Sequence, residues 1–151
     1  MLNIVLFEPE IPPNTGNIIR LCANSGMQLH LIQPIAFDMD DKKLRRAGLD
    51  YHEFANISIH ENFSSFYQQE QPQRLFSCTT KTDNSYADVD YQPNDYLLFG
   101  PETRGLPEEI INNTKISTAI TIPMKKHSRS INLSNAVAII AFEAWRQLDF
   151  Q

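Results

Sequence analysis

Short apolar runs alternate with stretches of helical periodicity along the whole chain, and polar or turn-forming residues separate them. The predicted strands are Leu2–Phe7, Gln28–Gln33, Leu75–Thr79, Tyr96–Phe99 and Ala119–Ile122. The predicted helices are Thr15–Ser25, Asp40–Ala47, Phe63–Gln69, Glu108–Asn112 and Ser134–Leu148. This alternation favours an α/β fold with a mostly parallel sheet flanked by helices. No repeat and no long linker interrupts the pattern, so residues 1–151 are predicted to form a single domain.

The first predicted helix carries start and stop signals at both ends. Asn14 follows two prolines and is a candidate N-cap, and Gly26 stands where a left-handed C-terminal residue is expected. On a helical wheel Asn17, Arg20 and Asn24 gather opposite the apolar side. This polar face is either a solvated surface or a grip for a phosphate group.

The last predicted helix is apolar around its whole circumference. Its large side chains include Ile139, Phe142 and Trp145, and Glu143 is almost alone as a charge. A helix of this kind must be covered on all sides, but one sheet covers only one side of it. We therefore expect a homodimer, with a second copy of the chain covering the remaining side.

Composition limits the classes of function without naming one. The chain has 13 Lys and Arg residues against 18 Asp and Glu residues, a net charge of −5 that argues against a general nucleic-acid coat protein. The N-terminus has no signal-peptide features and no run is long enough to span a membrane, so the cytoplasm is expected. Cys22 and Cys78 do not make a disulfide framework, and no Cys or His pair stands at ligand spacing, so no zinc site is expected.

Clusters of basic residues still allow RNA binding despite the negative net charge. Two basic clusters occur, and either is a solvated face or a binding surface: Lys42, Lys43, Arg45 and Arg46 form the first, and Lys125, Lys126, His127 and Arg129 form the second. The second cluster matters more, because it lies within a segment that has further chemical features.

Three segments concentrate glycine or small polar residues: 14–20, 97–107 and 122–136. Open α/β sheets place their ligands beyond the carboxyl ends of the strands, where two of these segments lie. Gly100 and Gly105 allow unusual backbone angles or close approach of another segment. Ser130 and Asn132 offer groups that either cap a helix or hold the edges of a ligand.

Other enzyme classes lack their motifs in this chain. There is no G-x-G-x-x-G after the first strand and no P-loop, so neither a dinucleotide site nor a nucleotide-triphosphate site is supported. No G-x-S-x-G elbow occurs, which weakens the case for a hydrolase.

The three segments resemble the signature motifs of the SPOUT (SpoU–TrmD) RNA methyltransferases, over essentially the whole chain. Further matching stretches are 7–14, 44–51 and 143–148. Within the superfamily the chain is most similar to the short enzymes that methylate cytidine or uridine 2′-hydroxyls in tRNA. The resemblance implies S-adenosylmethionine as methyl donor, no metal, the wobble nucleotide of leucine tRNAs as target, a C-terminal trefoil knot, and a homodimer formed through the last and first helices. It also implies no accessory RNA-binding domain and no membrane partner.

The resemblance also assigns residues. The donor contacts are Cys78, Gly100, Ile122, Ser130 and Asn132. Arg20 is placed at the reacting hydroxyl, reaching the partner subunit's donor, while Asn14 and Glu102 hold that arrangement. Because arginine stays protonated, we expect Arg20 to clamp the adjoining phosphate rather than act as a base. Arg104, Lys125, Lys126 and Arg129 are expected to line the entry for the tRNA anticodon arm.

Two other functions stay open. A non-catalytic RNA-binding factor with the same fold would bind RNA without methyl transfer and would have disrupted donor motifs. A methyltransferase for ribosomal RNA is the second; such relatives often carry an additional N-terminal RNA-binding domain.

Overall fold

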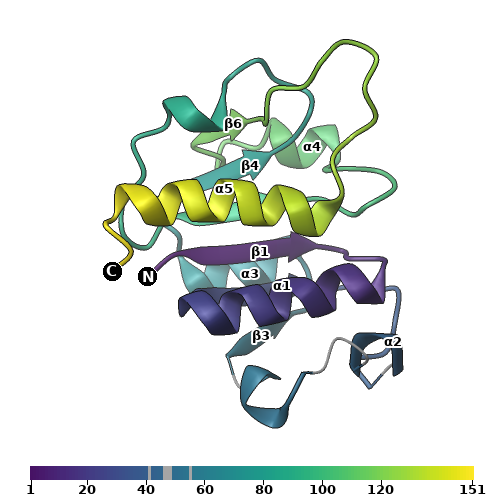
Figure 1. Cartoon of the computed structure of the whole chain (residues 1–151). Helices are drawn as coiled ribbons and strands as arrows, with labels where there is room; N and C mark the ends of the chain where they lie inside the picture. Colours follow the sequence, from purple (N-terminus) through teal and green to yellow (C-terminus); the bar gives the residue numbers. More distant parts are fainter. Residues whose placement is uncertain (41, 46–48, 55) are drawn as a thin grey trace.

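The structure is a computed structural model that describes all residues except 41, 46–48 and 55 (Figure 1). The strands are β1 (Asn3–Phe7), β2 (Gln28–Ile32), β3 (Ile57–His60), β4 (Leu75–Cys78), β5 (Tyr96–Phe99) and β6 (Thr118–Ile120). The helices are α1 (Pro12–Ser25), α2 (Lys42–Arg45), α3 (Phe63–Glu70), α4 (Glu108–Ile111) and α5 (Leu133–Gln147), with 3-10 turns at Tyr51–Phe54 and Tyr86–Asp88. None of the described helices is both long and apolar enough to cross a membrane.

The six strands form one parallel sheet in the order β3-β2-β1-β5-β4-β6. Along the chain, β2 and β3 are added on one side of β1, and β4, β5 and β6 then lie on its other side. The connections therefore leave β1 and β5 in opposite directions, and open parallel sheets place ligand sites beyond the carboxyl ends of strands near such a point. The predicted α/β class with a parallel sheet is confirmed.

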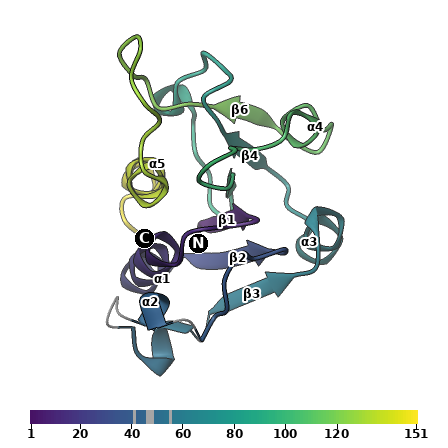
Figure 2. The ribbon, with the colours of Figure 1, turned by 90° about the vertical axis from the view of Figure 1, so that its right-hand side faces the viewer.

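Helices cover both faces of the sheet. Figure 2 shows α1 and α5 on one face and α3 and α4 on the other. The alternating side chains of β1 divide the core accordingly, because Ile4 and Leu6 belong to the cluster under α1 and α5. Val5 and Phe7 belong to the cluster that packs against Phe66 of α3. The strands are thus buried on both faces, as parallel strands usually are.

Most predicted elements are present, with small shifts at their ends. The strand β3 was not predicted, because Ile57–His60 is short and contains two polar residues. Part of the predicted helix Asp40–Ala47 lies outside the described residues, and its described part is α2.

The start of α1 corrects the prediction for Asn14. The helix begins at Pro12, and its N-cap is Ile11, which has no side-chain capping bond. Proline is favoured in the first turn because its φ is already helical and it has no N–H to leave unpaired. Asn14 is therefore a buried residue inside the helix. The end of α1 is as predicted, with Gly26 in the left-handed region at φ 74°.

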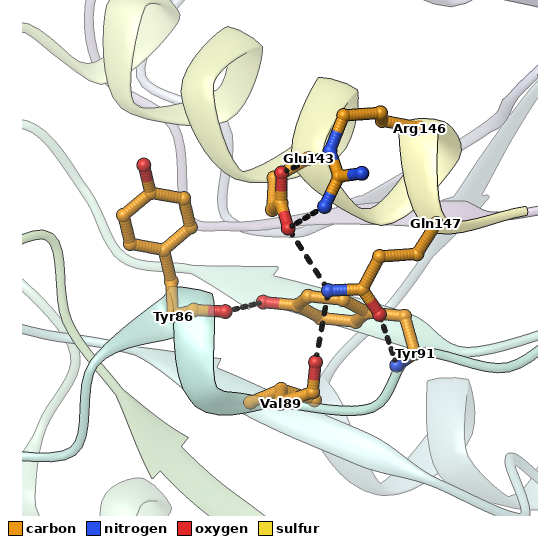
Figure 3. A network of polar contacts seen from close by, with 6 residues as sticks. All are labelled: Tyr86, Val89, Tyr91, Glu143, Arg146 and Gln147. Carbon is orange, nitrogen blue, oxygen red and sulfur yellow. Dashed lines mark hydrogen bonds and ion pairs between the residues drawn. The ribbon is translucent and has the colours of Figure 1, made fainter.

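The helix α5 is fixed at both ends by polar contacts. At its start the Asn132 side chain accepts hydrogen bonds from the backbone N–H groups of Ser134 and Asn135. At its end the Gln147 amide donates to the Val89 carbonyl at 3.0 Å and accepts from the Tyr91 N–H at 2.9 Å (Figure 3). These bonds hold α5 against the segment that leads into β5.

Candidate active site

A cavity of about 260 Å³ lies at the carboxyl ends of β4, β5 and β6. Its floor includes the last residues of these strands, Cys78, Phe99 and Ile120. Residues of the following loops and of α5 complete it, among them Gly100, Thr121, Ile122, Ser130 and Ala136. The volume is close to the lower end for ligand cavities, roughly 300 Å³. The cavity lies at the carboxyl edge of the sheet, the edge at which open parallel sheets bind ligands, on the β4–β6 side of the change of direction.

The loop after β5 is folded tightly upon itself. A Cβ atom on Gly100 would lie only 2.3 Å from the Leu106 backbone nitrogen, so no side chain fits at this position. Gly105 has φ 67°, a left-handed angle that favours glycine, and its N–H donates to the Pro101 carbonyl at 2.9 Å. The two glycines thus serve different needs: Gly100 allows close approach and Gly105 allows the turn.

Carboxylates tie this loop to the segment before α1. Oε2 of Glu102 accepts hydrogen bonds from the backbone N–H groups of Glu10 at 2.8 Å and Ile11 at 3.0 Å. In return, Oε1 of Glu10 accepts from the backbone N–H of Thr103 at 3.0 Å and from its hydroxyl at 2.8 Å. The bonds from Thr103 hold the pKa of Glu10 below its usual value. Residues more than ninety positions apart therefore lie side by side.

The second carboxylate oxygen of Glu102 makes no hydrogen bond within the described residues. This atom, Oε1, is buried. Because Glu102 also lines the cavity, this carboxylate has an acceptor left for a group that enters there.

A second link joins the predicted first and third segments. The amide nitrogen of Asn132 donates to Oδ1 of Asn14 at 3.1 Å. Asn14 is 6% exposed and Asn132 is exposed, so this partly buried bond joins the start of α1 to the start of α5. The first and third segments singled out in the sequence are therefore joined directly through Asn14 and Asn132. The second segment is bonded through Glu102 to Glu10 and Ile11, just before the first segment.

The predicted donor residues are only partly in the cavity. Cys78, Gly100, Ile122 and Ser130 line it. Asn132 is not among the described lining residues and instead caps α5, the alternative that its position also allowed. Burial raises the pKa of the Cys78 thiol, so it stays protonated and is a poor nucleophile.

Arg20 lies outside this cavity in the single chain. It is on α1, its side chain is 40% exposed, and its Nε is 2.7 Å from a carboxylate oxygen of Glu53. The described residues that line the cavity do not include Arg20. One chain alone therefore does not bring the predicted catalytic arginine to the predicted donor site.

Basic residues lie in two of the loops that border the cavity. Arg104 lines the cavity and is 57% exposed. Lys125, Lys126 and Arg129 are exposed in the loop that connects the lining residues Met124 and Ser130. Positive charge is thus concentrated at this edge despite the acidic net charge.

One group of lining residues was missed in the sequence. Thr79, Thr80 and Lys81 also line the cavity. Thr79 ends a predicted strand, and Thr80 and Lys81 directly follow it. Their position at a strand end, like that of Gly100, is the signal that indicates a ligand site.

Comparisons with known proteins agree with this geometry. Residues 1–142 match the model of the SpoU rRNA Methylase family. A tRNA (cytidine(34)-2′-O)-methyltransferase of Yersinia pestis is 62% identical over 99% of this chain and 96% of its own. A solved structure on the 2′-OH methylation of C/U34 on tRNA has 42% identity and a TM-score of 0.90 over 100% of this chain and 98% of its own.

A more distant solved structure concerns the donor. The SpoU methyltransferase AviRb from Streptomyces viridochromogenes, in complex with the cofactor AdoMet, is 25% identical with a TM-score of 0.85, covering 100% of this chain and 62% of its own. With a family match over residues 1–142 and a relative 62% identical over nearly the full length, the chain belongs to the SpoU methylase family.

Proposed function

We propose that this chain is a tRNA 2′-O-ribose methyltransferase that uses S-adenosylmethionine and acts on the wobble nucleotide, cytidine or modified uridine, of leucine tRNAs. The observation that carries the proposal is the near full-length identity of 62% to a protein named for methylation at cytidine 34 of tRNA. The choice of leucine tRNAs and of uridine as a second substrate rests on the sequence resemblance.

The cavity fits the proposed donor. Its lining mixes apolar residues with hydroxyl and backbone groups, and Cys78, Gly100, Ile122 and Ser130 would hold the donor there. The missing side chain at Gly100 keeps the loop closed over the strand ends. When bound, S-adenosylmethionine supplies a methyl group already activated by a positive sulfur, so we propose no metal for the reaction.

Arg20 is proposed to act on the acceptor. A ribose hydroxyl is a weak acid and must lose its proton as it attacks, so the site has to stabilise developing negative charge. A guanidinium bound to the adjoining phosphate lowers the pKa of the hydroxyl by its charge, and phosphate or water takes the proton. The ion pair with Glu53 supports this role, because it holds the guanidinium in a fixed orientation.

Asn14, Glu102 and Asn132 are proposed as positioning residues. Their hydrogen bonds connect the start of α1, which carries Arg20, to the loop and helix that border the cavity. Ser130 is proposed to contact the donor directly from the cavity wall.

The tRNA anticodon arm is proposed to bind at the cavity entrance through Arg104, Lys125, Lys126 and Arg129. Their exposure and their place around the cavity support this surface. Contacts of this kind release counterions from RNA, so affinity is expected to fall steeply with added salt.

A homodimer completes the proposed site. Ile139 and Phe142 of α5 are 37% and 40% exposed and form an apolar face beside α1. The Phe142 ring makes an edge-to-face contact with Trp145, and Trp145 makes a second one with Phe150. A second copy that covers this face through α5 and α1 would bring its own Arg20 toward the cavity of the first.

The remaining parts of the proposal concern the chain as a whole. Residues 1–151 act as one domain, and a tRNA substrate implies the cytoplasm. We also propose a trefoil knot in the C-terminal half, supported by the packing of α5 on β5 and by the bridge between Ser85 and Thr121.

The test uses donor with a labelled methyl group and total tRNA, with ribosomal RNA in a parallel reaction. Methylation at a ribose 2′-hydroxyl makes the following linkage resistant to alkali, so mapping resistant linkages identifies the nucleotide. We expect label at the wobble position of leucine tRNAs. Label in ribosomal RNA alone, or tRNA binding without transfer, would replace the proposal with one of the two other functions. Calorimetry with the donor alone tests the cavity separately.

A further inference from the structure

Three ligand-type side chains converge on the face of the sheet opposite α1 and α5. Nδ1 of His30 lies 3.2 Å from Nε2 of His60. Oε1 of Glu70 lies 3.7 Å from the first of these atoms and 3.6 Å from the second. A tetrahedral zinc ion with bonds of about 2.0–2.1 Å separates its ligand atoms by about 3.3–3.4 Å. The triangle formed by the three atoms is close to that size.

The outer nitrogen of each imidazole faces an amide oxygen. Nε2 of His30 is 3.2 Å from Oδ1 of Asn3, and Nδ1 of His60 is 3.0 Å from Oε1 of Gln69. An amide oxygen only accepts, so each outer nitrogen carries the proton. The two inner nitrogens then present lone pairs to each other and to the Glu70 carboxylate. A cation between them stabilises three acceptors that face one another, and the outer N–H of a metal-bound histidine usually donates to an oxygen atom.

The surroundings suit a bound metal ion. His30 and His60 are each 2% exposed, and the rings of Phe66 and Tyr96 pack around them. Glu70 is 27% exposed and, with Tyr96, lines a surface hollow of about 240 Å³. This hollow gives an ion a route from solvent.

We propose that His30, His60 and Glu70 bind one divalent transition metal ion of the Zn²⁺ class, with water in the fourth position. Two imidazoles and one carboxylate are donors that suit zinc. The site links β2, β3 and the end of α3 on the face away from the methyl-transfer cavity, so its role is structural and does not depend on the proposed function. The sequence predicted no zinc site because no Cys or His pair stands at close spacing, whereas these ligands are brought together by neighbouring strands.

The test starts from untagged full-length protein treated with a chelator and then dialysed. Titration with zinc sulfate in a calorimeter is expected to give one ion per chain. With free zinc at about a hundred times the dissociation constant, the thermal midpoint should rise by roughly 5–10 °C. Cobalt(II) should give the intense visible absorption of a four-coordinate site.

Two ligand variants and one control sharpen the result. Glu70→Gln removes the carboxylate at a partly exposed position, so the protein is expected to fold, and His60→Gln removes a buried ligand. Each should weaken zinc binding by more than about a hundredfold, the upper range for loss of a supporting residue. His127→Gln removes an exposed histidine far from the site and should leave the zinc affinity unchanged.

Two outcomes would overturn the proposal. If the wild-type protein shows neither heat nor a thermal shift with zinc, the histidines form a hydrogen-bonded pair with a proton between them. If Glu70→Gln folds and binds zinc as tightly as the wild type, the ion lies elsewhere. Neither outcome affects donor binding or methyl transfer, which are measured separately.

Discussion

The helices α1 and α5 pack side by side on the same face of the sheet, but they present opposite chemistry to solvent. The exposed side of α1 carries Asn17, Asn24 and the half-exposed Arg20. The exposed side of α5 carries Ile139 and Phe142. The sheet covers neither of these exposed sides, so exposure alone does not show that the two helices have different roles. Their chemistry does: the polar side suits a phosphate and the apolar side suits a second copy of the chain.

Replacing Arg20 should have the largest effect. In Arg20→Ala we expect kcat/KM to fall by about 10²–10³, because loss of one group that stabilises transition-state charge costs that much. Donor affinity measured by calorimetry should stay unchanged. Asn24→Ala, one turn further on the same exposed side, is the matched control and should keep nearly full activity.

Arg20→Lys separates two roles of the charge. If a planar fork must clamp the phosphate, lysine will not restore turnover, because it offers only a point charge. Near-full turnover with lysine would mean that charge alone is needed and would refute the clamp.

A mixing experiment tests whether Arg20 serves the partner's cavity. Arg20→Ala is inactive but keeps its cavity, and Ser130→Trp fills its cavity but keeps Arg20. If sites are shared between subunits, co-expressed mixtures should regain up to about a quarter of wild-type activity, because heterodimers are half of the population and have one intact site. No recovery in a mixture that contains heterodimers would place both groups in one chain.

Phe142→Glu places a charge on the apolar side of α5 and should weaken dimer formation. A two-fold interface uses the residue twice, and each buried Phe contributes about 1.5–3 kcal/mol, so dimer affinity should drop by at least about a hundredfold. Sedimentation over a range of protein concentrations measures this change. Asn112→Glu adds the same charge beside α4, on the other face of the sheet, and should leave association unaltered. A wild-type chain that sediments as a monomer at micromolar concentration would contradict the dimer itself.

Gln147→Met should have a moderate effect on stability. It removes the amide that bonds Val89, Tyr91 and Glu143, leaving backbone groups without partners, at a cost of about 1–2 kcal/mol (Figure 3). Urea unfolding compares it with Gln68→Met, an exposed position on α3 where we expect almost no change. Equal stability of the two variants would show that α5 is held by its apolar contacts alone.

The smallest effect concerns pH. Hydrogen bonds from Arg146, and next from Gln147, lower the pKa of Glu143 from 4.5 to about 2. The unfolded chain therefore binds more protons between these values, so the stabilisation is complete above pH 4.5 and is lost as the pH falls toward 2. Glu143→Gln should flatten this part of the stability profile slightly. An unchanged slope would mean that the pair is screened by solvent.

The sequence could predict what is encoded locally. The buried runs Asn3–Phe7 and Tyr96–Phe99, and the turn glycines at 26 and 105, depend on neighbouring residues only, and all were found. Four of the five predicted donor residues line the cavity, because loops that follow parallel strands gather at one edge of a sheet.

Contacts between distant segments could not be predicted in this way. Nothing near Asn14 in the sequence reveals that its partner is Asn132, so a cap at the helix start was the natural expectation. The same holds for His30 and His60, which become neighbours only because β2 pairs with β3 in a register that the apolar pattern does not fix.

The hydrogen bond between Asn14 and Asn132 has a consequence for the order of events at the site. It joins the first turn of the arginine-bearing helix to the cap of the helix that borders the cavity. If either ligand stiffens its own side of this junction, the other side is stiffened too. Thermodynamic linkage then requires donor and RNA to strengthen each other's binding by equal factors. Breaking this single amide contact should therefore uncouple the two affinities more than it lowers either one.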